Sequence, residues 1–302
     1  MILGPGIGRD FAAIRYDRLL VVTTDPVTGT SRKIGAHSVY INANDIATAG
    51  AKPVWYLCTI LLPPGTNEQE LAEIMEGIDT ACRKLGVTLA SGHTEATIGL
   101  DRPIIVGFMI GERRGRLLRS EDVRIGDMIL MTKTAGIEGA AILASDYEKR
   151  LRGIPARVLS RASAFSSQLS ILKEAQIVSK SRGVRVIHDP TEGGVLNACW
   201  ELGESAKLGV EVWADKIPVA PETSKICSRL GVDPLKLMSS GCLLAAVAPN
   251  HVDQVLRSLR KLQVRVSVIG TMTSHESGRH YSLEGKSFDL IPITQDELYK
   301  LT

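Results

Sequence analysis

Runs of apolar and polar positions divide the first part of the chain into alternating strands and helices. Strands are predicted at residues 11–14, 18–24, 54–62, 87–91 and 103–111. Residues 36–48 have helical spacing, and residues 66–86 place their apolar side chains on one stripe, with Thr66 and Gln69 spaced as a capping box. This order predicts a sheet with helices on one face, forming an N-terminal domain over residues 1–115.

The second half repeats an α/β pattern, although no sequence repeat is visible. Strands are predicted at residues 128–132, 184–187, 242–248, 264–269 and 288–292, and helices at about residues 140–152, 156–176, 222–230 and 251–262. Asp189 can act as the N-cap of a further helix that ends at Gly209, with Pro190 at its first position. Since 302 residues exceed one ordinary core and residues 112–127 are polar, we expect a C-terminal α/β domain over residues 120–302.

Composition narrows the class of protein. An apolar content of 44% with 23% charged residues is typical of globular proteins. A net charge of +3 and only 4% aromatic residues do not favour nucleic-acid binding. The longest strongly apolar run, residues 54–62, is too short to cross a bilayer, and the start lacks a charged-then-apolar leader. We therefore expect a cytoplasmic protein that binds neither nucleic acid nor membrane.

The cysteines and the missing motifs exclude several classes of site. The five cysteines are far apart and mostly in apolar contexts, which is typical of reduced core thiols: Cys58, Cys82, Cys199, Cys227 and Cys242. The chain contains no HExxH, GxSxG or GxxxxGK[ST] motif. Zinc peptidases, serine hydrolases and P-loop enzymes are therefore not favoured.

Candidate chemistry is concentrated between residues 21 and 55. A predicted strand ends at Asp25, a loop with Lys33 and Gly35 follows, and the next helix carries Asn44 and Asp45. Carboxylates that hold a divalent metal, beside backbone N–H groups and a cation that meet phosphates, suit a magnesium-bound polyphosphate. A turn-forming aspartate and a solvated Asn-Asp pair on a helix remain the structural alternative.

The first residues and the end of a later strand carry two further polar groups. Glycines, among them Gly6 and Gly8, precede Asp10 and can let backbone amides approach an anion, although a flexible end explains them equally. The spacing is not GxGxxG and follows no predicted strand, so a Rossmann fold is not favoured. Residues 87–91 form a strand that delivers Gly92, His93, Thr94 and Glu95 to its end.

These motifs together resemble a known superfamily. The succession is GxGxxDxAAI, TTD, GAxxVxxNANDIAxxGAxP, SGHTE, HDPTEGG and GVDPLxxxSSG, spread in order from Gly4 to about Gly270. It resembles the aminoimidazole ribonucleotide (AIR) synthetase superfamily (PurM-like), and within it hydrogenase maturation factor HypE and HypE-like AIR synthase-related proteins. The resemblance implies two α/β domains and a homodimer whose N-terminal strands form a shared barrel. It also implies ATP and Mg²⁺ as cofactors, used to activate a substrate oxygen by phosphoryl transfer.

The resemblance also assigns roles to residues of this sequence. The implied metal ligands are Asp10, Asp25 and Asp45, with Glu95 as a further candidate, and the implied catalytic residues are Asp45 and Asn44. The implied nucleotide-binding residues are Gly6, Gly8, Thr24, Lys33, Gly35, His93, Thr94, Asp189 and Thr191. ATP carries about four negative charges, so carboxylates can approach it only with Mg²⁺ between.

This sequence departs from the family pattern in three places. His93 stands where the family has an aspartate, so either Glu95 replaces it, the metal differs, or that metal position is lost. No cysteine lies near Thr302, whereas HypE dehydrates a carboxamide carried on its own C-terminal cysteine to a thiocyanate. The chain also starts inside the glycine-rich region.

Two classes of function remain open. One is an ATP-dependent enzyme acting on an amide, carboxylate or phosphate-bearing substrate, a class that includes a kinase resembling thiamine-monophosphate kinase. The other is a non-catalytic dimeric scaffold that binds a protein partner in a maturation complex.

Overall fold

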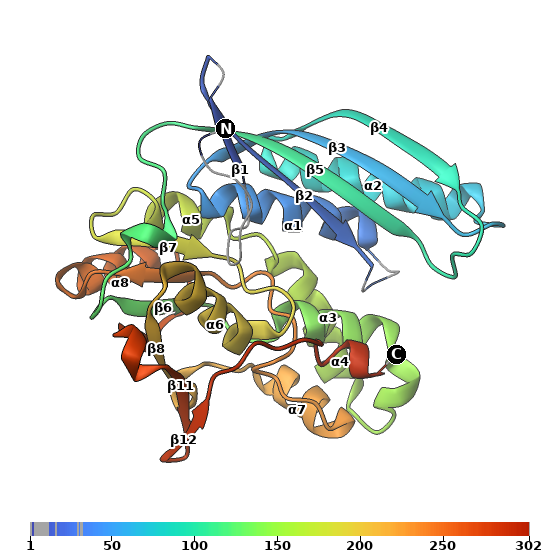
Figure 1. Ribbon diagram of the computed structural model, residues 1–302. Helices are drawn as coiled ribbons and strands as arrows, with labels where there is room; N and C mark the ends of the chain where they lie inside the picture. Colours follow the sequence, from blue (N-terminus) through green and yellow to red (C-terminus); the bar gives the residue numbers. More distant parts are fainter. Residues whose placement is uncertain (1, 3–11, 16, 29, 31–32, 302) are drawn as a thin grey trace.

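The protein, seen in a computed structural model, consists of two α/β units stacked on each other (Figure 1). The structure describes residue 2, residues 12–15, 17–28 and 30, and residues 33–301. Each unit is built around one sheet that contains both parallel and antiparallel strand pairs. The predicted fold class, two α/β domains with mixed sheets, is confirmed.

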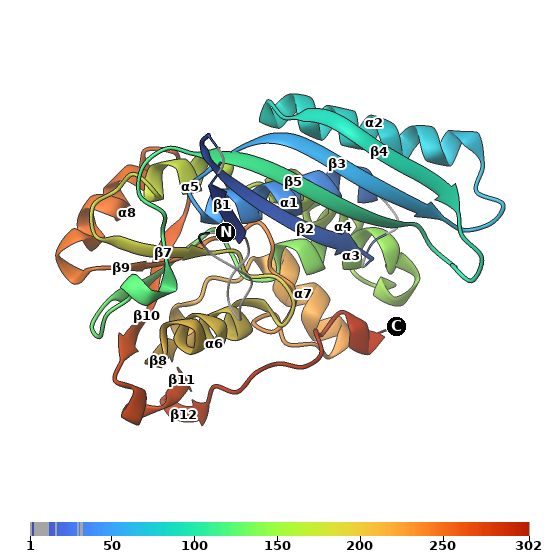
Figure 2. The same cartoon turned by 45° about the horizontal axis from the view of Figure 1, so that its top comes forward.

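The N-terminal unit is a sheet covered on one face by two helices. Its elements are β1 (Ala12–Arg15), β2 (Leu19–Val27), α1 (Ile34–Thr48), β3 (Lys52–Leu62), α2 (Glu68–Leu85), β4 (Thr88–Ala96) and β5 (Ile104–Arg113). Within the described residues the strand order is β1-β2-β5-β3-β4, and β3 with β4 is the parallel pair. Helices α1 and α2 lie on the same side of this sheet (Figures 1 and 2). Its other face, which we call the open face, carries the exposed side chains of Trp55 and Phe108.

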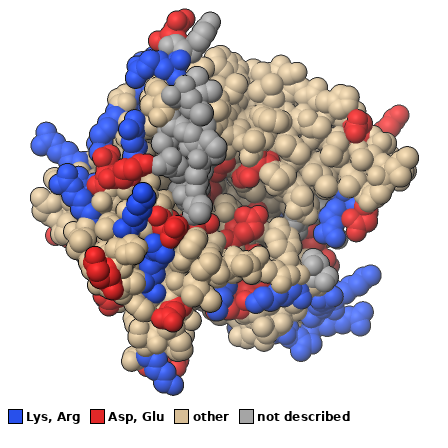
Figure 3. Space-filling view, in the orientation of Figure 1, with Lys and Arg blue, Asp and Glu red and all other residues tan. Residues whose placement is uncertain are grey.

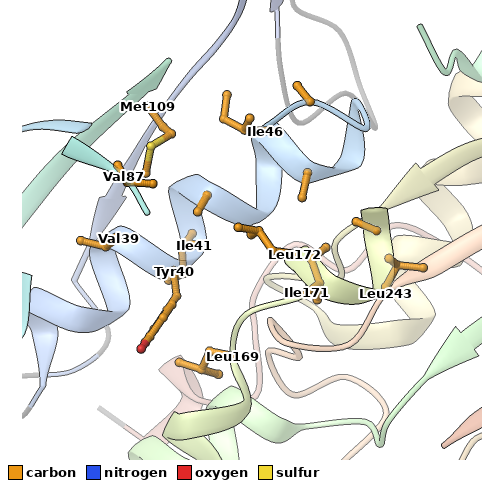
Figure 4. Packing of buried hydrophobic residues seen from close by; sticks show 14 of the residues in the cluster. Val39, Tyr40, Ile41, Ile46, Val87, Met109, Leu169, Ile171, Leu172 and Leu243 are labelled. Atoms are coloured by element: carbon orange, nitrogen blue, oxygen red, sulfur yellow. The ribbon is translucent and has the colours of Figure 1, made fainter. Parts of the chain in front are cut away.

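Helix α1 is the central element of the molecule. All of its residues except Ala36 are buried, because one side packs on the sheet and another packs on the second unit. Leu169, Ile171, Leu172 and Leu243 of the second unit lie against it (Figure 4). A helix buried on nearly every side holds its polar residues in fixed positions.

Helix α2 is the amphipathic helix expected from its stripe, with its cap one residue later than predicted. The side chain of Asn67 accepts a hydrogen bond from the backbone N–H of Glu70, and the carboxylate of Glu70 accepts one from the N–H of Asn67. Thr66, predicted as the cap, instead donates its hydroxyl to the carbonyl of Pro63 in the preceding turn. The capping box is therefore real, and its assignment to Thr66 and Gln69 was wrong.

The C-terminal unit has a larger sheet, and three helices of this unit pack together beside it. Its strands are β6 (Met128–Thr132), β7 (Val184–His188), β8 (Gly209–Trp213), β9 (Leu244–Val247), β10 (Val266–Thr273), β11 (Arg279–Leu283) and β12 (Lys286–Asp289). Its α-helices are α3 (Ile137–Asp146), α4 (Ala156–Ser163), α5 (Leu172–Val178), α6 (Gly194–Ala206), α7 (Pro221–Leu230) and α8 (Val252–Arg260). Within the described residues the strand order is β12-β11-β8-β10-β6-β9-β7. Helices α3, α4 and α7 pack on one another below the N-terminal unit (Figure 1).

Two helix predictions in this unit were wrong in detail. The helix expected over residues 156–176 is split into α4 and α5, because the connection between them forms a 3-10 helix over Ala164–Gln168 and a turn that is held by hydrogen bonds from other parts of the chain. Helix α6 begins at Gly194 and not at Pro190, since Gly193 and Gly194 both have positive φ angles of 74° and 64°. Asp189 is therefore not its N-cap.

The cysteines behave as the sequence predicted. All five lie in described ranges, are buried and form no disulfide. Burial raises the pKa of each thiol, as at Cys199, where it reaches about 12. No helix in the described ranges is both long and apolar enough to cross a membrane.

Candidate functional site

A cavity lined by carboxylates lies where the two units meet, and we call it the acidic cavity. Asp25 and Ile41 line it from the N-terminal unit, and Glu138, Thr191 and Glu192 line it from the C-terminal unit. Asp and Glu side chains gather in the hollow at the centre of the space-filling view (Figure 3). Both units are therefore needed to form the cavity.

Asp25 reaches the cavity because of strand alternation on β2. Val21 and Val27 are buried on the α1 side, and Asp25 shares their face because alternate residues of a strand point the same way. Its backbone N–H donates to Oδ1 of Asn42 at 3.1 Å, which ties the strand to α1. This bond to α1 fixes the position of Asp25 relative to the helix.

Asp45 lies on the same face of α1, one turn beyond Asn42. The hydroxyl of Thr23 donates to Oδ2 of Asp45 at 2.7 Å, and Asp45 is only 5% exposed. The structure therefore places Asp25 and Asp45 at the same junction between β2 and α1. Asp45 itself is not among the residues that line the acidic cavity.

Glu138 is the most perturbed acid of the cavity. It lies in the first turn of α3 and is buried. Its pKa is raised to about 8, mainly by burial; a hydrogen bond with Ser240 lowers it, and the negative charges of Glu192, Asp296 and Asp25 add to the increase. Glu138 therefore carries a proton at neutral pH. Asp25 and Glu138 come from different units and line the same cavity.

Asp296 connects the end of the chain to this site. Its carboxylate accepts hydrogen bonds from the N–H groups of Gly193 at 2.7 Å and Leu298 at 2.8 Å. Burial raises its pKa to about 6, partly offset by those two N–H groups. Tyr299, three residues further, lines the acidic cavity. The last turn of the chain thus forms one wall of the site.

Asp189 and Thr191 lie in the loop between β7 and α6. Asp189 is fully buried, and Thr191 lines the acidic cavity. The carbonyl of Thr191 accepts from the N–H of Gly194, and a Cβ at Gly194 would come within 2.6 Å of the Leu237 carbonyl oxygen. Only glycine allows this close approach, so the loop conformation that presents Thr191 depends on it.

Four predicted site residues lie away from the acidic cavity. Thr24 points to the open face, opposite to Asp25. His93 and Glu95 are exposed on β4, an edge strand, where Nε2 of His93 lies 3.3 Å from Oε2 of Glu95. Their partners on β3 are Thr59 and Leu61, so they share the open face, while Thr94 lies on the other. Within one chain these residues do not meet Asp25.

Three others have roles in packing or in holding a loop. Gly35 lies where α1 crosses α2, and a Cβ there would come within 2.1 Å of the Ile74 carbonyl oxygen. The Asn44 amide donates to the carbonyl of Leu169 at 2.8 Å and accepts from the N–H of Ile171 at 3.0 Å. Lys33 is exposed at the start of α1, with Nζ 3.0 Å from Oγ of Ser166. Gly6, Gly8 and Asp10 lie outside the described residues.

The donor set of the cavity fits a magnesium ion that arrives with a nucleotide. No group of three or more His, Cys, Asp or Glu side chains is positioned to hold a metal in the described ranges. Mg²⁺ usually keeps several waters and takes one or two carboxylates together with substrate phosphates, so a three-ligand cage is not required. Asp25 and Glu192 are the cavity carboxylates that would hold it, and Thr191 adds a hydroxyl.

Sequence reasoning missed Glu138, Glu192 and Asp296. Glu138 stands in the sequence GIEG, and Glu192 stands in the HDPTEGG motif, where it reads as an acidic residue of a helix start. Asp296 had no signal at all, because its role depends on the C-terminal segment folding back onto Gly193. The sequence signal that could have identified Glu138 as a site residue is its position in the first turn of a helix, just after a glycine.

Family models match both units of the chain. The model described as AIR synthase related protein, N-terminal domain, matches residues 8–113, and the corresponding C-terminal domain model matches residues 124–282. The chain belongs to the AIR synthase-related family. The first match ends at residue 113 and the second begins at residue 124.

Relatives of this family member include hydrogenase maturation proteins. A putative hydrogenase expression/formation protein of Methanocaldococcus jannaschii is 29% identical over 87% of this chain and 78% of its own length. The carbamoyl dehydratase HypE of Bradyrhizobium diazoefficiens is 30% identical over 84% of this chain and 74% of its own length. The resemblance to HypE-like proteins is therefore confirmed.

Solved structures establish the AIR synthase-related fold for the whole chain. HypE in complex with ATP superposes with a TM-score of 0.80 at 23% identity, covering 95% of this chain and 89% of that chain. HypE in a HypE–HypF complex gives 0.81 at 20% identity, with coverages of 95% and 94%. A ThiL protein complexed with AMPPCP and TMP gives 0.75 at 18% identity, with coverages of 96% and 90%.

Proposed function

We propose that this protein is an ATP-dependent, magnesium-requiring enzyme that activates an amide or carboxylate oxygen of its substrate by phosphoryl transfer. The observation that carries the proposal is the acidic cavity, in which Asp25 of one unit faces Glu138 and Glu192 of the other. Family membership supports it, since relatives include carbamoyl dehydratases and a HypE structure contains ATP. The substrate itself is left open at the level of an amide or carboxylate.

The carboxylates of the cavity would supply positioning and charge. When bound, Mg²⁺ would neutralise phosphate charge so that acidic side chains can approach ATP. The backbone of Asp25 is hydrogen-bonded to Asn42, and the Asp45 carboxylate accepts a hydrogen bond from Thr23. Both residues are therefore preorganised. In this proposal Asp25 binds the ion directly and Asp45 orients the β2–α1 junction, with Asp10 as a further ligand from the N-terminal segment.

Glu138 would act as a proton donor in the cavity. Its carboxyl is protonated at neutral pH, so its O–H can donate to an oxygen that gains negative charge during transfer. A cation in the cavity would lower the pKa of Glu138, which makes its carboxyl a stronger proton donor. The hydroxyls of Thr191 and Ser240 line the same wall and offer neutral donors.

A homodimer formed through the open face belongs to the same proposal. Trp55 and Phe108 are 39% and 43% exposed on that face, beside Thr24 and Leu57. Burying such side chains is the usual driving force for association. His93, Glu95 and Thr24 would then lie at the interface, where a second chain could bring them to the nucleotide. A further protein partner, as in a maturation complex, is compatible with the HypE–HypF complex of the relative.

Two alternatives differ in the products they form. A scaffold that binds a protein partner without turnover is favoured by the HypE–HypF complex of a relative, and would form no product. A small-molecule kinase is favoured by the fold shared with ThiL, and would leave a stable phosphorylated product instead of a dehydrated one.

Calorimetric titration with ATP and Mg²⁺ tests the proposal. We expect heat of binding with wild type, and a loss of at least about tenfold in affinity for Asp25→Asn and Asp45→Asn. Asp101→Asn, an exposed acid in the loop before β5, is the matched control and should bind as wild type. Thermal melting would verify that each variant is folded. No heat with wild type, or unchanged heat in both variants, would remove the enzyme proposal.

A further inference from the structure

A second groove lies between the two units, beside the C-terminal ends of α1 and α5. It is bounded by Gly50 and Lys52 after α1, by Glu112, Arg113 and Arg114 at the end of β5, and by the end of α5 with Lys180. It encloses about 580 Å³, which is the size of a small-molecule site. No lining residue is shared with the acidic cavity.

The groove carries an excess of positive charge. Lys52, Arg113, Arg114 and Lys180 line it, and Glu112 is its one acid among the described lining residues. Glu112 is already paired with Arg18 at 2.9 Å. Lys52, Arg114 and Lys180 form no ion pair with any residue in the described ranges. Four cations in one groove repel one another unless an anion enters.

Arg113 forms a rigid floor for the groove. Its guanidinium donates to the carbonyl of Gly50, and through Nε and Nη2 to the carbonyl of Arg116 at 3.0 and 2.6 Å. These bonds use three of its five N–H groups and leave two. A Cβ at Gly50 would come within 2.8 Å of Arg113 Nη1 and 2.6 Å of Ser179 Cβ, so glycine allows the two units to close here.

The need to stabilise the carbonyl ends of nearby helices explains only one of these four cations. Helices α1 and α5 both end at the groove, and their carbonyl ends attract positive charge. Arg113 meets that need by binding the Gly50 carbonyl, whereas the side chains of Lys52, Arg114 and Lys180 form no hydrogen bond with a described residue. The positive charges of Lys52, Arg114 and Lys180 therefore have no partner among the described residues.

We propose that this groove binds a small polyanion that carries two or more phosphate or carboxylate groups. Lys52 and Arg114 come from the N-terminal unit and Lys180 from the C-terminal unit, so one ligand would bridge both. Two or more anionic groups are required to reach cations on both sides. Such a ligand would stabilise the junction between the units, independently of the nucleotide.

Titration with pyrophosphate and with citrate, in low-salt buffer freed of divalent cations on a chelating resin, tests this proposal on the full chain. Without a divalent cation the acidic cavity repels anions, so binding reports the groove even if the ATP proposal fails. We expect both a rise in melting temperature and saturable heat, weakening as sodium chloride is added. The double variant Lys52→Ala with Lys180→Ala should weaken binding about tenfold or more, whereas Lys225→Ala, an exposed lysine on α7, should not.

The outcomes separate the possible ligands. Pyrophosphate binding without citrate binding assigns the groove to phosphates, the reverse assigns it to carboxylates, and both support the proposal. Equal binding by wild type and the double variant would overturn it. Binding of an acidic polypeptide such as polyglutamate, with neither small anion bound, would also overturn it and assign the surface to a protein partner.

Discussion

At the scale of single residues, Glu138 shows how burial converts an ordinary acid into a group with a different charge. Its pKa rises to about 8 because the low-dielectric cavity disfavours the carboxylate, and because Glu192, Asp296 and Asp25 add negative charge. Gly35 shows an effect of side-chain size: because it has no Cβ, α1 can lie close to Ile74 of α2. Both properties come from neighbours that are distant in sequence.

Replacing Glu138 should change how stability depends on pH. The folded-state pKa lies above the ordinary value of 4.5, so between pH 4.5 and about 8 the unfolded chain loses this proton while the folded chain keeps it. Stability from this group is therefore present at low pH and lost as pH rises through that window, by up to about 1.4 kcal/mol per pH unit. Glu138→Gln, measured by urea unfolding in EDTA, should flatten the decline between pH 5.5 and 7.5. Glu76→Gln, on the exposed side of α2, is the control, and a wild-type slope in Glu138→Gln would contradict the assignment.

At the scale of elements, the connection between α4 and α5 is held from two sides. Asn44 of α1 binds Leu169 and Ile171, and Nζ of Lys133 donates to the carbonyls of Gln168, Ser170 and Gly241 while pairing with Glu174 at 2.8 Å. Backbone groups that would otherwise form a helix are satisfied by these side chains instead. The connection therefore joins the N-terminal unit to the C-terminal sheet.

Removing the Asn44 amide should weaken this connection. Asn44→Ala leaves a buried N–H and a buried carbonyl unsatisfied, and we expect a loss of about 2–4 kcal/mol in the free energy of unfolding, measured with urea. Asn250→Ala, at an exposed position, should remain within about 0.5 kcal/mol of wild type. A stable Asn44→Ala that has lost ATP turnover would instead support the catalytic role implied by the family resemblance.

At the scale of the whole molecule, the two faces of the N-terminal sheet differ in how far they are covered. One face is covered by α1 and α2 (Figure 2). On the open face the side chains of Trp55 and Phe108 are exposed. The edge strand β4 is exposed over most of its length, which a single chain rarely leaves uncovered. The open face and its edge are the surfaces through which we propose that two chains associate.

A charge placed on the open face should prevent that association. We expect wild type to sediment as a dimer and Phe108→Asp as a folded monomer, because burying an unpaired carboxylate is costly. Phe288→Asp on β12 is a close control, since Phe288 is 41% exposed and Phe108 43%. A monomeric wild type, or a dimeric Phe108→Asp, would contradict the proposed interface.

The sequence by itself determined the elements and their class. Strand patterns, the stripe of α2, the polar linker and the ordered motifs led to two α/β domains of this family, because local periodicity and turn residues act within a few positions. Local signals also placed carboxylates at Asp25, Asp45 and Asp189. They located α2 well and its cap to within one residue, since capping depends on side chains three residues apart.

Only the tertiary structure decided which of those residues meet. Asp25 faces Glu138 across the two units, Asn44 is used by a loop more than a hundred residues away, and His93 lies on the opposite sheet face from Asp25. The break between α4 and α5 likewise depends on Asn44 and Lys133, and the start of α6 on space beside Leu237. Contacts between distant segments overrode local preference at each of these places, because burial and hydrogen bonding act through space and not along the chain.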